Sequence, residues 1–127
     1  MNINQKEIEA LCSGSAYHRY EYFIKKVVDW GEAWGLYDEG WALAGDDDEA
    51  QVFPIWPARE YANLCAKNMW ESFTPRKITL DDFLKELIPT IENDGISLGI
   101  FPTPNKMAVI TDFDRLKKDI ALELSKY

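Results

Sequence analysis

A tryptophan-rich segment in the first half of the chain constrains the fold most, because an alternating apolar pattern there replaces a helical one. Trp34 and Leu36 fall on one face of a predicted strand, and Trp41 and Leu43 fall on one face of the next. The loop between them ends at Gly40, which suits the left-handed conformation that closes such turns. The pattern therefore predicts a β-hairpin in which Trp34 and Leu36 lie across from Trp41 and Leu43.

The residues that follow predict a third strand and a helix. We expect the strand near residues 52–55, and Pro54 indicates that it is short or at a sheet edge, because proline cannot donate to the ladder. Pro57 suits the first position of a helix, where its missing N–H needs no partner. The apolar face expected for this helix carries Ala58, Tyr61, Ala62, Cys65 and Met69.

Two helices are predicted before the alternating segment. The first begins near Asn4, with Glu7 as its capping-box partner, and ends around residues 13–14. Ser15 is expected to cap the second helix and Gly31 to end it. The apolar stripe of this second helix consists of Tyr20, Phe23, Ile24, Val27 and Trp30, whereas its polar face carries His18, Tyr22, Lys25, Lys26 and Asp29.

The last third of the chain predicts further helices and two strands. A helix is expected from Thr79 to about residue 94, capped by its first residue and kinked or divided at Pro89. Strands at residues 96–100 and 107–110 follow, and Thr111 is expected to cap a final helix. That helix should bury Phe113, Leu116, Ile120 and Leu124.

The elements together predict one domain. The chain has 127 residues, of which 46% are hydrophobic and 28% are charged, as is typical of a globular protein. It has no repeat, linker or low-complexity tract. Residues 1–127 are therefore expected to form a single α+β domain with about five largely antiparallel strands, helices packed on the sheet and the order ααβββααββα.

Motifs for catalysis, metal binding and membrane insertion are absent from the sequence. His18 is the only histidine, which excludes a site with two histidine ligands, and no hydrolase or phosphate-binding motif occurs. Cys12 and Cys65 are far apart in sequence and are expected to be free thiols. No apolar run approaches the roughly 20 residues of a membrane span, and the N-terminus lacks the order of a signal peptide. We predict a cytoplasmic protein with no cofactor, no metal site and no catalytic residue.

The net charge of −8 is concentrated in one part of the chain. Between residues 27 and 58 there are eight carboxylates and no lysine or arginine. Such a surface disfavours nucleic acid and anionic membranes and favours a basic protein partner, although solvated turns use the same residues. The candidate partner-binding residues are Asp38, Glu39, Asp46, Asp47, Asp48 and Glu49, with the neighbouring aromatic residues Trp34 and Trp41.

Arg59 is a candidate anion-binding residue. It lies in the first turn of its predicted helix, where the macrodipole disfavours a cation unless an anion is present. Trp56 and Tyr61 are expected beside it. Alternatively, Arg59 pairs with the nearby acidic loop or packs on Trp56 by a cation–π contact.

Several short segments in this order resemble the small bacterial proteins of domain-of-unknown-function family 2750. The resemblance covers about residues 17–124, nearly the whole chain. It implies a shared fold and supplies no catalytic residues. The segments that carry it are Trp34-Gly35-Leu36, Gly40-Trp41-Ala42, Pro54-Ile55-Trp56-Pro57, Glu60-Tyr61-Ala62 and Ile100-Phe101-Pro102.

Two functional hypotheses follow from the sequence. The first is a non-enzymatic interaction or regulatory domain that uses its acidic hairpin face. The second is a small-molecule binding protein or enzyme with an anion pocket near residues 56–59. A flat acidic face beside exposed aromatic residues favours the first hypothesis, whereas a deep pocket converging on Arg59, His18 or Tyr61 favours the second.

Overall fold

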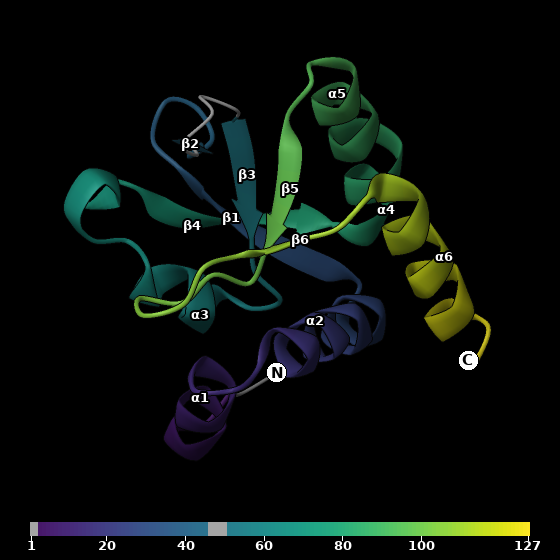
Figure 1. Ribbon diagram of the computed structural model, residues 1–127, viewed down its shortest axis with the longest axis horizontal. Helices are drawn as coiled ribbons and strands as arrows, with labels where there is room; N and C mark the ends of the chain where they lie inside the picture. Colours follow the sequence, from purple (N-terminus) through teal and green to yellow (C-terminus); the bar gives the residue numbers. More distant parts are fainter. Residues whose placement is uncertain (1–2, 46–50) are drawn as a thin grey trace.

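The strands form two sheets in the part of the chain that the computed structural model describes, residues 3–45 and 51–127. The larger sheet has the order β2 (Ala44–Gly45), β3 (Gln51–Ile55), β5 (Ser97–Ile100) and β6 (Val109–Ile110). β3 runs parallel to β5, whereas the two outer pairs are antiparallel. A second, antiparallel ribbon consists of β1 (Glu32–Tyr37) and β4 (Thr74–Thr79) (Figure 1).

Two tryptophans join the ribbon to the larger sheet. The Trp34 N–H donates to the carbonyl of Trp56 at 2.9 Å, and the Trp56 N–H donates back to the carbonyl of Trp34 at 2.8 Å. Trp56 directly follows β3 and is fully buried. The end of β3 therefore rests against the start of β1, and both sheets share one hydrophobic core.

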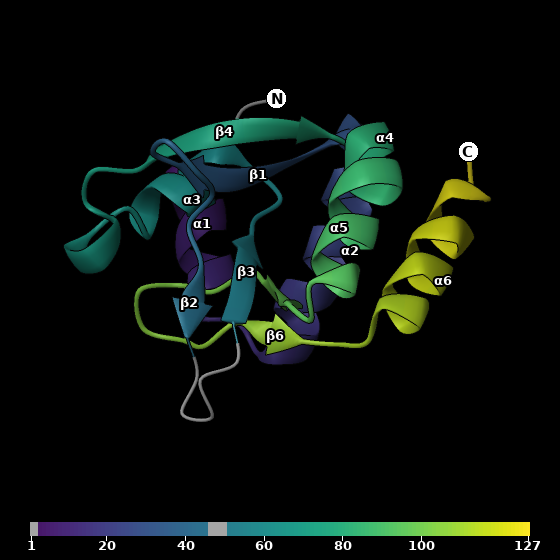
Figure 2. The same ribbon diagram turned by 90° about the horizontal axis from the view of Figure 1, so that it is seen from above.

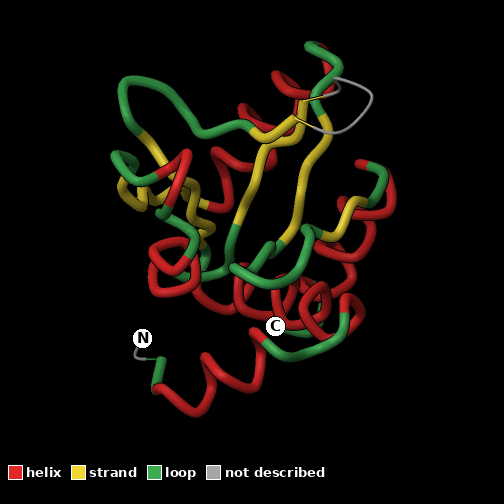
Figure 3. Tube along the Cα trace, turned by 60° about the vertical axis from the view of Figure 1, so that its left-hand side comes forward, coloured by secondary structure: helices red, strands yellow, loops and turns green. Residues whose placement is uncertain are grey.

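Helices lie on several sides of the strands: Figure 2 shows them to the left and to the right, and Figure 3 shows the largest group below. Near the N-terminus are α1 (Gln5–Cys12) and α2 (Ala16–Trp30), and α2 packs beneath the strands in Figure 1. Between β3 and β4 are α3 (Arg59–Leu64) and a short 3-10 helix (Asn68–Trp70). The helical segment after β4 consists of α4 (Leu80–Asp82), a π-helical turn (Phe83–Leu87) and α5 (Ile88–Asn93), and α6 (Phe113–Leu124) follows β6.

The structure confirms the predicted α+β class and most helix boundaries. The side chains of Asn4, Ser15 and Thr79 cap α1, α2 and α4. Gly31 ends α2 with φ = 68°, where a residue without a Cβ atom meets no steric penalty. Pro89 follows the π-helical turn, so the predicted division of this helix occurs just before the proline.

The predicted hairpin is confirmed only in part: the chain folds back antiparallel to β1, but it forms no second regular strand there, and β1 pairs along its length with the distant β4. Trp34 stands opposite Lys77, and Leu36 stands opposite Pro75. Residues 38–43 instead fold back along β1 and join it through an isolated bridge between Tyr37 and Trp41. The register of the two segments is thus not the one that the alternating pattern predicted.

The turn at residues 38–40 also differs from the prediction. Glu39, not Gly40, has the left-handed conformation, with φ = 60°. The Asp38 N–H donates to the carbonyl of Gly40 at 2.9 Å, and the Ala42 N–H donates to the carbonyl of Leu36 at 2.8 Å. These bonds satisfy the backbone locally, so the chain returns along β1 without forming a second regular strand.

Smaller corrections concern individual positions. β4 was not predicted, and β3 lies inside its sheet although Pro54 suggested an edge. Pro54 is tolerated there because β2 pairs only with the first two residues of β3. The cap of α6 is Asp112, not Thr111, because the Asp112 carboxylate accepts from the Arg115 N–H. Three further predictions were wrong: α3 begins after Ala58 rather than at Pro57, and both Met69 and Leu124 are exposed.

Candidate functional site

The ribbon, β3 and the helical segment α4–α5 border an open groove with a volume of about 820 Å³, called the aromatic groove below. Its floor is apolar and buried, and it consists of Phe53, Ile78 and Ile91. Half-buried walls rise from this floor to an exposed, charged rim. The wall residues are Tyr37, Trp41, Leu43, Leu87 and Ile96, and the rim residues are Arg76, Lys77, Asp82, Glu86 and Thr90.

Trp41 forms one wall of the groove by lying over Gly35 of β1. A Cβ atom at position 35 would lie 2.8 Å from Cζ3 of the Trp41 ring, which is too close for a normal contact. The same ring packs edge-on against Tyr37 at 5.1 Å between ring centroids and against Phe53 at 5.6 Å. The glycine therefore allows the indole to lie against the strand, and the tyrosine and phenylalanine hold it there.

Arg76 completes this wall from the neighbouring strand. It stands opposite Gly35 in the β1–β4 register, so its side chain projects from the same face of the ribbon. Its guanidinium carbon lies 4.2 Å from the centroid of the Tyr37 ring and 5.8 Å from that of the Trp41 ring. This stacking is a cation–π arrangement that stiffens the aromatic wall.

The charges of the rim lie on two different elements. Arg76 and Lys77 belong to β4, whereas Asp82 and Glu86 belong to the helical segment that follows it. Lys85, on the same helical segment, pairs with Asp81 at 2.9 Å instead. Within residues 3–45 and 51–127, none of the four rim charges forms an ion pair, and the Arg76 guanidinium stacks on aromatic rings.

The structure divides the predicted partner-binding residues. Trp41 lines the aromatic groove, and Asp38 and Glu39 are exposed on the turn that carries it. Trp34 lies elsewhere, half-buried, with its indole N–H donating to the Glu32 carboxylate at 2.8 Å. The predicted residues Asp46, Asp47, Asp48 and Glu49 lie outside the described part of the chain.

The predicted anion-binding residues do not share an exposed surface. Arg59 is exposed at the start of α3, but Trp56 and Tyr61 are 0% and 1% exposed. The Trp56 indole N–H donates to the carbonyl of Pro102 at 2.8 Å, and the Tyr61 hydroxyl donates to that of Tyr22 at 3.1 Å. The polar atoms of both aromatic residues are therefore already paired inside the protein.

A chain of polar side chains links α3 to α1 through α2. Tyr61 donates to Tyr22, and Tyr22 donates to the carboxylate of Glu7. Burial raises the pKa of the Tyr61 hydroxyl to about 12, and burial together with the bond to Glu7 raises the pKa of Tyr22 further. Both hydroxyls consequently stay protonated at neutral pH and act as hydrogen-bond donors.

Raising the pH through the tyrosine range should destabilise the protein. A group whose pKa is raised by folding contributes stability below its unfolded pKa and loses it as the pH passes the folded pKa. For Tyr61 this window runs from 10.0 to about 12. Denaturant unfolding over this range should show a falling free energy, and the fall should be smaller in Tyr61→Phe and Tyr22→Phe. If the free energy of unfolding fell as much in both variants as in the native chain, the two tyrosines would not be the groups responsible.

The remaining candidate reactive groups have no catalytic arrangement in the described residues. His18 is exposed on α2. Both cysteines are free, and burial raises the pKa of the Cys65 thiol to about 11, so this thiol is a poor nucleophile. No three His, Cys, Asp or Glu side chains of residues 3–45 and 51–127 gather as a metal site. None of the helices in the same residues has the length and apolar character needed to span a bilayer.

The sequence matches the model of one known protein family. The family model described as "Protein of unknown function (DUF2750)" matches residues 20–120. The chain belongs to this family. The matched segment includes every residue of the aromatic groove, whereas α1 precedes it. Neither curated proteins nor solved structures gave a match.

Two of the five family-like segments identified in the sequence meet at the groove in this DUF2750 chain. Gly35 and Trp41 come from two of those segments and meet at one wall. Sequence reasoning missed Arg76, Asp82 and Glu86. The four residues before Ile78, Thr74-Pro75-Arg76-Lys77, show no apolar alternation, and the two carboxylates resemble the solvated face of an ordinary helix.

Proposed function

We propose that this chain is a cytoplasmic, non-enzymatic protein-interaction domain whose aromatic groove receives an apolar side chain of a partner segment. The half-exposed Trp41 wall above a buried apolar floor is the observation that carries this proposal. Binding energy at protein interfaces is concentrated where aromatic residues line such pockets. The volume of about 820 Å³ also falls in the range of about 300–1,000 Å³ that is usual for ligand sites.

Charge supports a basic partner. The chain carries a net charge of −8, so its long-range field attracts cations. Asp82 and Glu86 stand at the rim, and Asp38 and Glu39 are exposed on the turn beside Trp41. A segment with one large apolar residue flanked by lysine or arginine fits this combination, because its apolar residue enters the groove and its cations face the rim carboxylates.

The cations of the rim support a second candidate function. Arg76 and Lys77 stand beside an apolar groove, which is the arrangement that binds an amphipathic organic acid. In that case a fluorescent naphthalene sulfonate dye should bind, and Arg76→Gln with Lys77→Gln should weaken it. A peptide with basic residues should instead bind these variants at least as well as the native chain.

Selection from a displayed library of short random peptides tests the main proposal. Enriched peptides should share one large apolar residue next to lysine or arginine. Trp41→Ala should weaken their binding by about tenfold or more, because it removes a wall of the pocket. Titration calorimetry or fluorescence anisotropy with one enriched peptide measures this change.

Trp30 provides a matched control for that experiment. It is also half-buried and also carries a cation over its ring, with the Lys26 ammonium 5.0 Å from the centroid, but it lies on α2. Trp30→Ala should leave peptide binding unchanged. Enriched peptides without an apolar anchor, or equal losses in the two variants, would contradict a binding role for the groove.

A further inference from the structure

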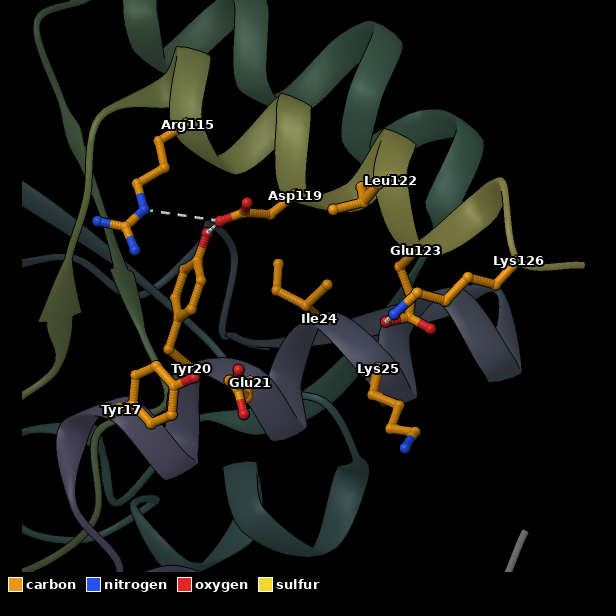
Figure 4. Close-up of a pocket in the computed structure, with 10 residues that line it drawn as sticks. All are labelled: Tyr17, Tyr20, Glu21, Ile24, Lys25, Arg115, Asp119, Leu122, Glu123 and Lys126. Carbon is orange, nitrogen blue, oxygen red and sulfur yellow. Dashed lines mark hydrogen bonds and ion pairs between the residues drawn. The ribbon is translucent and has the colours of Figure 1, made fainter.

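A second depression lies between α2 and α6, and it shares no lining residue with the aromatic groove. It has a volume of about 360 Å³. Figure 4 shows the side chains of α6 above it and those of α2 below, with Ile24 and Leu122 between them. A smaller hollow lined by Val109 and Ile110 of β6 adjoins it, because Tyr17, Tyr20 and Arg115 line both.

Exposed apolar side chains gather along these two hollows. Tyr17 is 63% exposed, Ile110 is 54% exposed and Leu122 is 63% exposed. They come from α2, β6 and α6, and each lines at least one of the two adjoining hollows. Apolar side chains that cluster on a surface mark an interaction site more often than single exposed ones do.

The charges of this surface are balanced although the chain as a whole is acidic. The larger depression is lined by the carboxylates of Glu21, Asp119 and Glu123 and by the cations of Lys25, Arg115 and Lys126. Its formal charge is therefore zero, compared with −8 for the whole chain. Two copies of the chain repel each other through their acidic surfaces but not through this one.

The order of charges along α2 is self-complementary. Glu21 and Lys25 are four residues apart, so they project from the same face of the helix. Asp119 is engaged by the Tyr20 hydroxyl and by Arg115 at 3.7 Å, and Glu123 is engaged by Lys126 at 3.3 Å (Figure 4). Glu21 and Lys25 form no ion pair in the described residues, and Glu21 accepts a hydrogen bond from the Tyr17 hydroxyl on the same helix. A carboxylate has two oxygens, so Glu21 can still face a cation of a second molecule.

We propose that this face binds a second copy of the same chain, forming a two-fold symmetric dimer. A two-fold axis that crosses α2 between Glu21 and Lys25 places each carboxylate against the ammonium of the other copy. Leu122 of each copy then contacts the apolar part of the opposite depression. Such an isologous interface needs a surface that is complementary to itself, and the balanced charges and shared apolar residues meet this requirement. The aromatic groove shares no lining residue with this face.

Charge exchange with sedimentation velocity tests the dimer. The native chain should sediment with the mass of two chains. Glu21→Lys places two cations together at each contact, and Lys25→Glu places two carboxylates together, so each should weaken dimerisation by about tenfold or more. The double variant Glu21→Lys, Lys25→Glu restores opposite charges and should restore the dimer.

An apolar substitution tests the same face independently of charge pairing. Leu122→Glu should give single chains, whereas Met69→Glu, which changes a residue 74% exposed on the 3-10 helix, should leave the dimer intact. Circular dichroism spectra would verify that each variant is folded. A native chain that sediments as a single copy at the highest concentration would overturn the proposal. A dimer that survives Glu21→Lys or Leu122→Glu, or one that the double exchange does not restore, would also overturn it.

Discussion

Replacing Arg19 with methionine should lower the free energy of unfolding by about 3 kcal/mol, because it removes two charge-assisted hydrogen bonds in the interior. Arg19 is only 4% exposed, and its Nη1 atom donates to the carbonyls of Phe101 at 2.6 Å and Met107 at 3.0 Å. These bonds tie α2 to the segment between β5 and β6. They also hold Phe101 in a left-handed conformation, with φ = 52°, that a phenylalanine rarely adopts.

Thermal and denaturant unfolding measure the effect of Arg19→Met. Methionine retains an apolar stem of similar length, so the main loss is the hydrogen bonds to the two carbonyls. The melting temperature should fall by on the order of 10 °C. Arg59→Met removes an exposed arginine and should change stability little. Equal stability of the Arg19→Met variant and the native chain would show that the carbonyls of Phe101 and Met107 do not depend on this side chain.

Gly35→Ala should destabilise the chain by about 2 kcal/mol, because the added methyl group cannot fit beside Trp41. The methyl carbon would lie 2.8 Å and 2.9 Å from two ring atoms of the indole, so the ring has to leave its place on the strand. Contacts of the ring with Tyr37 and Phe53 are lost in the same movement. The substitution should therefore weaken peptide binding as well as stability.

A double-mutant cycle distinguishes this clash from a general effect of alanine in β1. When Trp41 is first replaced by alanine, Gly35→Ala should cost less than about 0.5 kcal/mol, because no ring occupies the space. Denaturant unfolding of the native chain, both single variants and the double variant supplies the four free energies. Additive losses would mean that Gly35 is required for another reason than the packing of Trp41.

Local patterns in the sequence predicted the helices well because the signals for their ends act over a few residues. Ser15 and Gly31 bound α2 in the structure as expected. The stripe from Tyr20 to Val27 is buried, again as the helical spacing predicted. Arg19 went unrecognised because an arginine next to such a stripe is usually exposed, and its acceptors are carbonyls more than 80 residues away.

Strand pairing was less predictable, because it depends on contacts between distant segments. The alternation at Trp34 and Leu36 correctly indicated a strand, but the partner strand begins at Thr74. β4 combines a proline with four polar residues and buries only Ile78, so its pattern resembles a loop. The turn residues near Gly40 favoured a local hairpin, in which β1 would pair with the segment that follows it. In the structure β1 pairs with β4, which is more than 35 residues further along the chain.

The candidate site was only partly predictable for the same reason. Trp41 was identified from its aromatic character and its place beside an acidic turn. The groove itself exists only because β4 and the helical segment α4–α5 come to lie next to the ribbon. Arg76 reaches the tryptophan through its register with Gly35, which no local pattern shows.

Mapping a bound peptide onto the protein by nuclear magnetic resonance tests most directly whether the aromatic groove binds a partner segment. The chain has five tryptophans, so their indole N–H groups give separate signals. On addition of a peptide selected by display, the indole signal of Trp41 should shift, together with the backbone amides of Ile78, Leu87 and Ile96. The indole signal of Trp30 should stay in place. Shifts centred on other residues, with an unchanged Trp41 signal, would contradict the proposal that the aromatic groove is the binding site.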